Sequence, residues 1–337
     1  MNNKRVYGSF SAVKKAVVPK KGTIRNDKTG IPDKGLYESV LHNLKSDKII
    51  SKNRTNFTKK EAAKLKELGA KFSGVKSLKG IENLTNLESL SIFNNKITSL
   101  APLKNLTKLK RLSAYNNKIT SLVPLKKLIR LEELDVAYNR ITSLSGIKKL
   151  KRLESLYAGR NKIPSLMGIE KLTNLSYLNV HKNRITSLVP LKNLTNLKSL
   201  YANNNRLTSL EGIENLTRLK NLSVGWNRII SLEGIENLTN LNELSAPFNK
   251  IVNADSLSGL KKLLWLDLAA NKLSRLPDLR YLTTSNGSFH FDGNQLTREE
   301  LIAKMPVHLT NHKGWGWLDE QLKYVDMDRY YSKEYEW

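Results

Sequence analysis

The stretch LEELDVAYNRITSL, residues 131–144, decides the fold, because its spacing recurs along most of the chain. Its central Asn139 belongs to a series of asparagines that follow one another at steps of 22 residues, with one step of 23 at the end. Leucine lies five residues before the first nine of them, and isoleucine or leucine lies two residues after. The ten asparagines are Asn95, Asn117, Asn139, Asn161, Asn183, Asn205, Asn227, Asn249, Asn271 and Asn294.

This unit, L-x-x-L-x-L-x-x-N-x-I-x-x-L, is a leucine-rich repeat. Each unit is too small to bury its own apolar side, so neighbouring units must stack, each adding one short strand to a parallel sheet. Side chains alternate along a strand, so Leu134 and Val136 point into the core while Asp135 points to solvent. The sequence therefore predicts an α/β leucine-rich-repeat solenoid whose curved parallel sheet forms the concave face. We interpret the repeat asparagines as buried amides that satisfy backbone groups of the adjacent turn.

The chain divides into four segments by composition and periodicity. Residues 1–28 are rich in Lys, Ser, Gly and Asn and lack periodicity, which predicts a disordered basic tail. A solenoid must cover its open apolar ends. We therefore expect a helical N-terminal cap over residues 29–76, about ten repeats over 77–296 and a helical C-terminal cap over 297–337.

Both caps contain helix signals. Thr58 and Glu61 form a capping box that opens a helix expected over 59–68, with Gly69 as its stop. Thr297 and Glu300 form a second capping box, before a helix expected over 299–304. An earlier helix is expected from the apolar spacing of Leu36, Val40, Leu41 and Leu44. A last amphipathic helix is expected around Trp317, Leu318, Leu322 and Val325. The aromatic residues that follow it either pack on the last repeat or remain free.

Composition sets further limits. No run of 18 apolar residues occurs, so no membrane-spanning segment is expected. The chain has no cysteine, which excludes disulfides and zinc sites built on cysteine. The short apolar stretch near the start is broken by Lys14 and Lys15, so no signal peptide is recognised.

Residues 31–296 resemble internalin-like proteins of Gram-positive bacteria. The likeness rests on the Ile31-Pro32-Asp33 start of the cap, the apolar residues of its first helix, residues 58–68, and the sequence LKGIENLTNL at residues 78–87. The resemblance implies a secreted or cell-surface protein that binds a host or neighbouring protein through its concave sheet. A cytoplasmic location is the alternative, because no signal peptide, immunoglobulin-like domain after the repeats or LPxTG sorting motif is recognised.

The solvent-facing strand positions are the candidate binding residues, because they vary while the framework does not. Nearly every repeat offers an aromatic ring there, and strands about 4.8 Å apart would align the rings in a contiguous stripe about 40 Å long. Tyr, Trp and Arg dominate binding hot spots. The candidates are Phe93, Tyr115, Tyr138, Tyr157, Arg160, Tyr177, His181, Tyr201, Trp226, Phe248 and Trp265.

These rings have two interpretations. They could stack on one another to stiffen the sheet, as cross-strand aromatic pairs do. Binding is favoured because small residues would leave room beside the rings, namely Gly159, Gly225 and Ala137. A protein is the leading ligand. A glycan is the alternative on the same face, with rings stacking on sugars and hydrogen bonds supplied by Asn179, Asn203 and Asp267.

The residue after the repeat asparagine is basic in nine successive units, which predicts a basic ridge. Its members are Lys96, Lys118, Arg140, Lys162, Arg184, Arg206, Arg228, Lys250 and Lys272. Residues 1–80 also carry 20 Lys and Arg against 6 Asp and Glu, a net +14 of the chain's +27. This charge favours an anionic polymer or surface as a further partner, although such residues also serve as solvated filler.

Motifs for chemistry are scarce. His308 and His312 have i,i+4 spacing but no carboxylate at ligand spacing, so no metal site is expected. His181 and Asp135 would lie about 10 Å apart, too far for a hydrogen-bonded acid–base pair. No P-loop, G-x-S-x-G or sequence-specific nucleic-acid-binding motif occurs. We therefore expect a non-enzymatic binding protein without cofactors, and a monomer, because a solenoid capped at both ends does not require a second copy.

Overall fold

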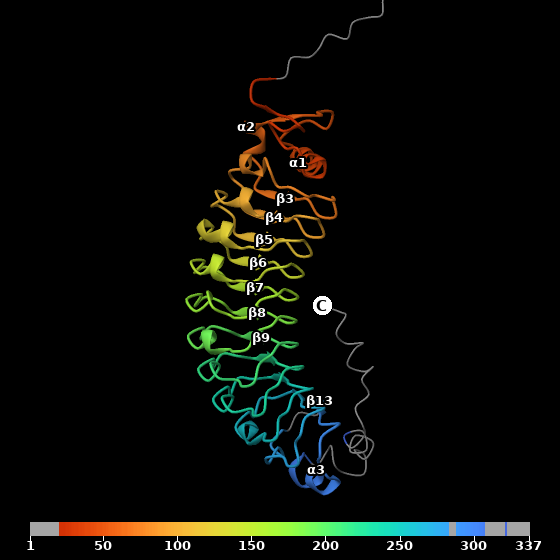
Figure 1. The fold of residues 1–337 in the computed structure, drawn as a ribbon, viewed down its shortest axis with the longest axis vertical. Helices are drawn as coiled ribbons and strands as arrows, with labels where there is room; N and C mark the ends of the chain where they lie inside the picture. The colour runs from red at the N-terminus through yellow and green to blue at the C-terminus, as the bar shows by residue number, and fades with distance from the viewer. Residues whose placement is uncertain (1–19, 283–287, 307–320, 322–337) are drawn as a thin grey trace, which may run out of the picture.

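The computed structural model describes residues 20–282, 288–306 and 321 of the 337-residue chain. These residues form a long arched solenoid in which parallel strands stack as rungs (Figure 1). The main sheet has 11 strands and runs in chain order from β3 to β13. Their bounds are Glu67–Gly69 for β3, Ser89–Ser91 for β4, Arg111–Ser113 for β5, Glu133–Asp135 for β6, Ser155–Tyr157 for β7, Tyr177–Asn179 for β8, Ser199–Tyr201 for β9, Asn221–Ser223 for β10, Glu243–Ser245 for β11, Trp265–Asp267 for β12 and Ser288–His290 for β13.

The strand register follows from the leucine spacing. Leu112 of β5 pairs with Leu134 of β6, which pairs with Leu156 of β7. A slip of one residue would turn every leucine to solvent, so the repeat length fixes the stack. The core position two residues after each leucine alternates in size and is buried at Ala114, Val136, Ala158, Val180, Ala202, Val224 and Ala246. The predicted parallel-sheet solenoid is confirmed.

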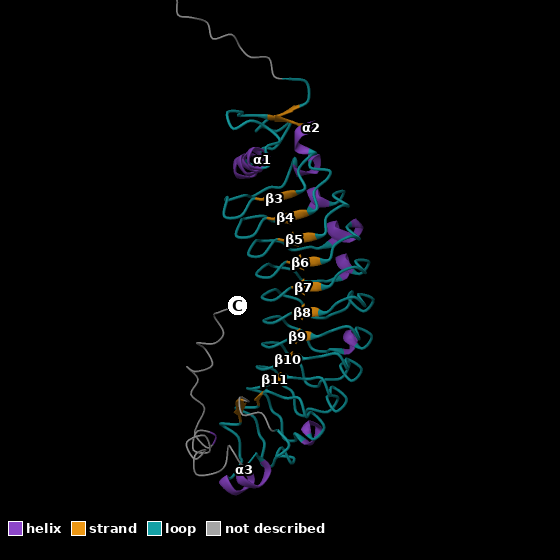
Figure 2. Ribbon diagram, turned by 180° about the vertical axis from the view of Figure 1, so that it is seen from behind, coloured by secondary structure: helices purple, strands orange, loops and turns teal. Residues whose placement is uncertain are grey.

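Short 3-10 helices line the outer edge of the arch (Figure 2). They close many of the return segments, and three of them have proline in their first turn. Proline suits that position because its fixed φ matches the helix and it has no N–H to satisfy. The helices are η1 at Ile81–Asn83, η2 at Ala101–Leu103, η3 at Val123–Lys127, η4 at Ser145–Ile147, η5 at Val189–Leu191 and η6 at Asp255–Leu257.

The repeat asparagines bridge neighbouring repeats, as the sequence predicts. The Asn139 side-chain nitrogen donates to the carbonyl oxygens of Ala114, Val136 and Ala137 at 3.0–3.1 Å. Its side-chain oxygen accepts from the Ile119 N–H at 2.9 Å. The pattern recurs along the stack, so backbone groups that would otherwise be buried without partners are satisfied.

The N-terminal cap contains helix α1 (Lys34–Ser46) and an antiparallel pair of strands, β1 (Thr23–Ile24) and β2 (Phe57–Thr58). Leu36, Val40 and Leu44 of α1 are buried, as predicted, and Asp33 caps the helix by accepting from the Leu36 N–H. The second carboxylate oxygen of Asp33 accepts from the N–H groups of Lys76 and Ser77. These two hydrogen bonds join the cap to the first repeat.

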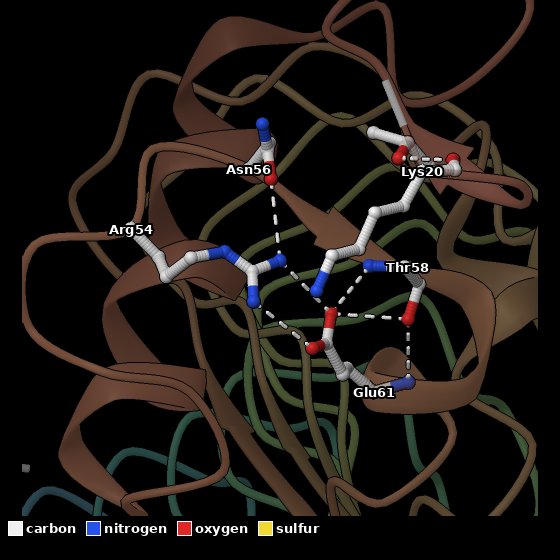
Figure 3. A network of polar contacts seen from close by, with 6 residues as sticks. Lys20, Arg54, Asn56, Thr58 and Glu61 are labelled. Carbon is white, nitrogen blue, oxygen red and sulfur yellow. Dashed lines mark hydrogen bonds and ion pairs between the residues drawn. The ribbon is translucent and has the colours of Figure 1, made fainter. Parts of the chain in front are cut away.

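The predicted capping box is present at helix α2 (Lys59–Ala62). The Thr58 hydroxyl accepts from the Glu61 N–H, and the Glu61 carboxylate accepts from the Thr58 N–H at 2.7 Å. Arg54 then binds both Glu61 oxygens and reaches Asn56 (Figure 3). Burial raises the pKa of Glu61, but the Thr58 and Arg54 hydrogen bonds outweigh it and the net shift is downward.

Two predictions in the cap are wrong. The helix expected over 59–68 ends at Ala62, because Glu67–Gly69 forms β3, the first strand of the sheet. Within the tail expected over 1–28, Thr23–Ile24 instead pairs with β2, and Ile24 is only 2% exposed. Isolated apolar residues in a basic segment gave no periodic signal, so this contact could not be recognised.

At the other end, helix α3 spans Arg298–Lys304 and Thr297 caps it, as predicted. The expected capping box is only half formed, because the Glu300 carboxylate accepts from the Leu276 N–H at 2.7 Å and not from the Thr297 N–H. That bond ties α3 to the last repeats. The helix expected around residues 317–325, the terminal aromatic residues and the pair His308 and His312 lie outside the described residues, as does most of the basic tail.

Candidate binding face

The side chains that leave the sheet on its solvent side fall in four columns, which together we call the sheet face. In β7 the first two columns are occupied by Ser155 and Tyr157, on either side of buried Leu156. The third and fourth columns follow the strand at Gly159 and Arg160, just before the repeat asparagine. Parallel registry places each residue beside the one 22 positions later, so every column runs the length of the stack.

Residues of the fourth column adopt the left-handed conformation, with φ between 50° and 57° from Asn94 to Ala270. Asparagine and glycine tolerate this region, whereas bulky side chains there are strained by about 1 kcal/mol or more. Asparagine fills the column in only three of these nine repeats. The others carry Tyr138, Arg160, Lys182, Trp226, Phe248 and Ala270. The sequence pattern alone did not reveal this backbone constraint.

All eleven predicted binding residues lie on the sheet face and are half-buried. The expected contiguous stripe is wrong, because the rings occupy different columns in different repeats and, among the described residues, contact one another in separate groups. Tyr115 packs on Tyr138 with ring centres 4.9 Å apart. The guanidinium carbon of Arg160 lies 4.6 Å from the ring centre of Tyr138. The other groups are Phe72 with Phe93, Tyr157 with Tyr177 and Tyr201, Trp226 with Phe248, and Trp265 with His290.

Two of the three small residues, Gly159 and Gly225, do not leave room beside the rings, contrary to the sequence-based interpretation. A Cβ at Gly159 would lie 2.3 Å from the Nδ1 of His181, so the imidazole covers that glycine. A Cβ at Gly225 would lie 2.9 Å from Pro247. Gly159 and Gly225 therefore accommodate side chains of the next repeat.

Carboxylates gather at β6 and β7, and the sequence analysis did not single out this group. Glu133 and Asp135 of β6 lie on the sheet face, and Glu132 and Glu154 immediately precede β6 and β7. We call these four residues the carboxylate patch. The pKa of Asp135 is raised to about 6, chiefly by burial and to a smaller extent by the Glu133 charge, although the hydrogen bond from the Ala137 N–H lowers it. Asp135 also raises the pKa of Tyr115 and Tyr157, where burial is the larger cause.

All nine members of the predicted basic ridge are exposed. None of them takes part in an ion pair with another described residue. Their backbone N–H groups bond to the preceding repeat, as Lys118 does to the Ile97 carbonyl at 2.8 Å, so the ridge keeps the spacing of the stack. The ridge is therefore a continuous, accessible row of positive charge.

Groups suited to metal binding do not converge in the described part of the chain. Within residues 20–282 and 288–306, no three His, Asp or Glu side chains are arranged to hold a metal ion. His181 contacts the Asn179 side-chain oxygen at 2.7 Å rather than Asp135. No helix in the described part of the chain is long and apolar enough to cross a membrane.

Comparison with known proteins identifies the repeats. A family model described as "Leucine Rich repeats (2 copies)" matches residues 63–105, 107–149, 129–174 and 195–237. No protein with a curated description matches the chain. Such repeats mediate protein–protein binding as a class.

Three solved structures illustrate the likeness. Internalin InlF from Listeria monocytogenes is 28% identical, with a TM-score of 0.53, over 79% of this chain and 91% of that one. The plant peptide hormone receptor RGFR1 in complex with RGF2 shares the fold alone. It is 23% identical, with a TM-score of 0.60, over 70% of this chain and 45% of that one. Internalin C2 from Listeria monocytogenes is 31% identical, with a TM-score of 0.59, over 62% of this chain and 91% of that one. From this coverage and the repeat pattern, the chain belongs to the internalin-like leucine-rich-repeat proteins.

Proposed function

We propose that this protein is a non-enzymatic binding protein that recognises a protein partner through its sheet face. The observation that carries the proposal is the set of half-exposed rings that this face presents from β4 to β12. Aromatic residues and arginine supply most hot spots in protein interfaces. Tyr157, Tyr177 and Tyr201 are spread over three adjacent strands, which matches a partner lying along the stack.

The fourth column supports the same proposal. Tyr138, Trp226 and Phe248 occupy a left-handed backbone position that asparagine would fill with less strain. Strained positions are retained where function requires the side chain. Trp226 and Phe248 stack with ring centres 4.0 Å apart and planes 14° from parallel.

The test is capture of binding partners from extracts of surface proteins and glycans by the intact chain and by two triple variants. One variant is Tyr157→Ser, Tyr201→Ser and Trp226→Ser. The control, Ile129→Ser, Met167→Ser and Ile230→Ser, removes three exposed apolar side chains outside the sheet face. A protein retained by the control and lost by the sheet-face variant supports the proposal, whereas a glycan with that behaviour supports the alternative ligand.

A second candidate function is binding of an anionic polymer by the basic ridge. The observation that favours it is the row of nine exposed cations without ion-pair partners in the described chain. Neighbouring charges lie about one strand spacing apart, within the Debye length of about 8 Å, so a polyanion would relieve their repulsion. Binding of this kind falls steeply as salt rises. A ligand released by salt and kept by the sheet-face variant would assign the function to the ridge.

We also propose a secreted or cell-surface location, as the similarity to the internalin structures implies. Fractionation of the producing cells tests this location. Recovery with the medium or the cell envelope supports it, and recovery with the cytoplasm alone would contradict it.

A further inference from the structure

The carboxylate patch is negatively charged, whereas the molecule as a whole is strongly positive. The chain carries +27, yet Glu132, Glu133, Asp135 and Glu154 lie on two adjacent repeats without a described cation within ion-pair distance. Glu133 and Glu154 are exposed, and Glu132 and Asp135 are half-buried. The Glu133 charge raises the pKa of Asp135, so these two carboxylates repel each other and lower stability unless another group neutralises them.

The nearest basic residues of the preceding repeat are already engaged. Arg111 lies beside Glu133 in the sheet, but its guanidinium reaches back to Glu67 at 3.4 Å. Lys110, one repeat before Glu132, binds Glu88 at 2.9 Å. On the other side, the strand neighbours of Glu133 and Asp135 are uncharged, namely Ser155 and Tyr157.

The fold does not need the charge of Asp135. Its side-chain oxygen accepts from the N–H two residues later, that of Ala137, at 3.1 Å. Asn179 occupies the same column in β8 and makes the same bond to the His181 N–H at 3.2 Å. A neutral amide therefore meets the backbone requirement, and the desolvated carboxylate at position 135 is an unfavourable choice for stability alone.

Aromatic rings border the patch. Tyr157 pairs directly with Asp135 across the sheet, and Tyr115 lies close enough for Asp135 to raise its pKa. A cation placed over a ring and beside a carboxylate gains from both, because the ring face is negative and the carboxylate supplies a charge-assisted hydrogen bond. Exposed rings beside carboxylates thus match a Lys or Arg side chain.

We propose that the sheet face at β5–β7 docks a basic segment of a partner protein, whose Lys or Arg side chain lies against Asp135 and Glu133 between Tyr115 and Tyr157. This inference rests on the proposed function and names the chemistry of the partner. A basic segment is repelled by the molecule as a whole, but screening confines that repulsion to about 8 Å at physiological salt. The local carboxylates therefore decide where it docks.

The test uses a short fluorescent peptide of alternating lysine and serine, with an alternating glutamate and serine peptide for comparison. Binding is measured by fluorescence anisotropy at physiological ionic strength on the full chain. The variant Glu133→Gln/Asp135→Asn is compared with Glu211→Gln/Glu233→Gln, which removes the same charge from exposed positions outside the sheet face. Thermal unfolding confirms that each variant is folded.

The lysine peptide is expected to bind the wild type and the control equally, and the patch variant about tenfold or more weakly. Failure of the lysine peptide to bind the wild type, or an equal loss in both variants, would overturn the inference. Preference for the glutamate peptide with no effect of the patch variant would also overturn it. A protein captured through Tyr157, Tyr201 and Trp226 but indifferent to the patch variant would leave the proposed function intact and refute this inference alone.

Discussion

At the residue scale, the repeat asparagine is the side chain on which the backbone of each turn depends. Asn139 makes three donor contacts and one acceptor contact to the backbone of its own and the preceding repeat. Asn139→Ala should lower the free energy of unfolding by about 2–4 kcal/mol, because four buried backbone groups lose a partner. Urea denaturation measures the change. Asn174→Ala, at an exposed site, should change it by less than about 0.5 kcal/mol, and equal losses in both would contradict this role.

The left-handed column gives a second residue-scale prediction. Ala270 has a φ of 53°, which glycine adopts without strain. Ala270→Gly should raise the free energy of unfolding by about 0.5–1 kcal/mol. Ala246→Gly, at a buried strand-end position, should instead lower it, because a core methyl group is lost and the backbone gains freedom. A loss of stability at position 270 as well, in the same denaturation experiment, would show that the column is not strained.

Asp135 links stability to pH. Burial raises the pKa of its carboxyl from 3.8 to about 6, so between these values the folded state holds the proton more tightly than the unfolded state. Stability therefore falls as pH rises through that window, and the full penalty is present above about pH 6. Asp135→Asn should stabilise the protein by about 1–3 kcal/mol above about pH 7 and leave it unchanged below about pH 3.5. Denaturation at both pH values tests this, and the absence of a gain at the higher pH would contradict it.

At the element scale, the cap depends on the network around α2. Thr58, Glu61 and Arg54 hold the helix start beside the β1–β2 pair. Thr58→Ala removes the hydroxyl cap and should lower the free energy of unfolding by about 1–2 kcal/mol. Thr98→Ala, at an exposed repeat position, is the matched control and should have little effect. A similar effect of the two substitutions would mean that the cap contributes no more than the surface.

Elements differ in how far the sequence predicts them. The strands and their register were predictable, because a fixed 22-residue period leaves one way to bury every leucine. The end of α2 was not, since Glu67–Gly69 pairs with β4 and this tertiary contact overrides local helix signals. The β1–β2 pair likewise depends on partners distant in sequence.

The binding face was predictable in membership but not in arrangement. Alternation along the strand identified which residues leave the core. The distribution of rings over four columns depends on the left-handed turn. The residue types do not predict this turn, because bulky residues such as Tyr138 and Trp226 adopt it. The covering of Gly159 by His181 depends on a side-chain direction from the next repeat. The carboxylate patch was missed because the pairing of the neighbouring cations elsewhere, Lys110 with Glu88 and Arg111 with Glu67, depends on side-chain directions that the sequence does not give.

At the scale of the whole molecule, charge is sorted over the surface. The nine cations of the basic ridge are exposed along one row, whereas the carboxylate patch lies at β6 and β7, with Glu133 and Asp135 on the sheet face. The two regions therefore favour partners of opposite charge. They also respond differently to salt, because extended charge arrays are screened more strongly than partly buried contacts.

The central claim is that the sheet face binds a protein partner. The most direct measurement is the Kd of a captured protein for the intact chain, the Tyr157→Ser/Tyr201→Ser/Trp226→Ser variant and the Ile129→Ser/Met167→Ser/Ile230→Ser control, each at low and physiological salt. We expect the sheet-face variant to bind at least about thirtyfold more weakly, which corresponds to about 2 kcal/mol. The control should match the intact chain at both salt concentrations. Unchanged binding by the sheet-face variant, with release of the ligand by salt, would contradict the account and move the function to the basic ridge.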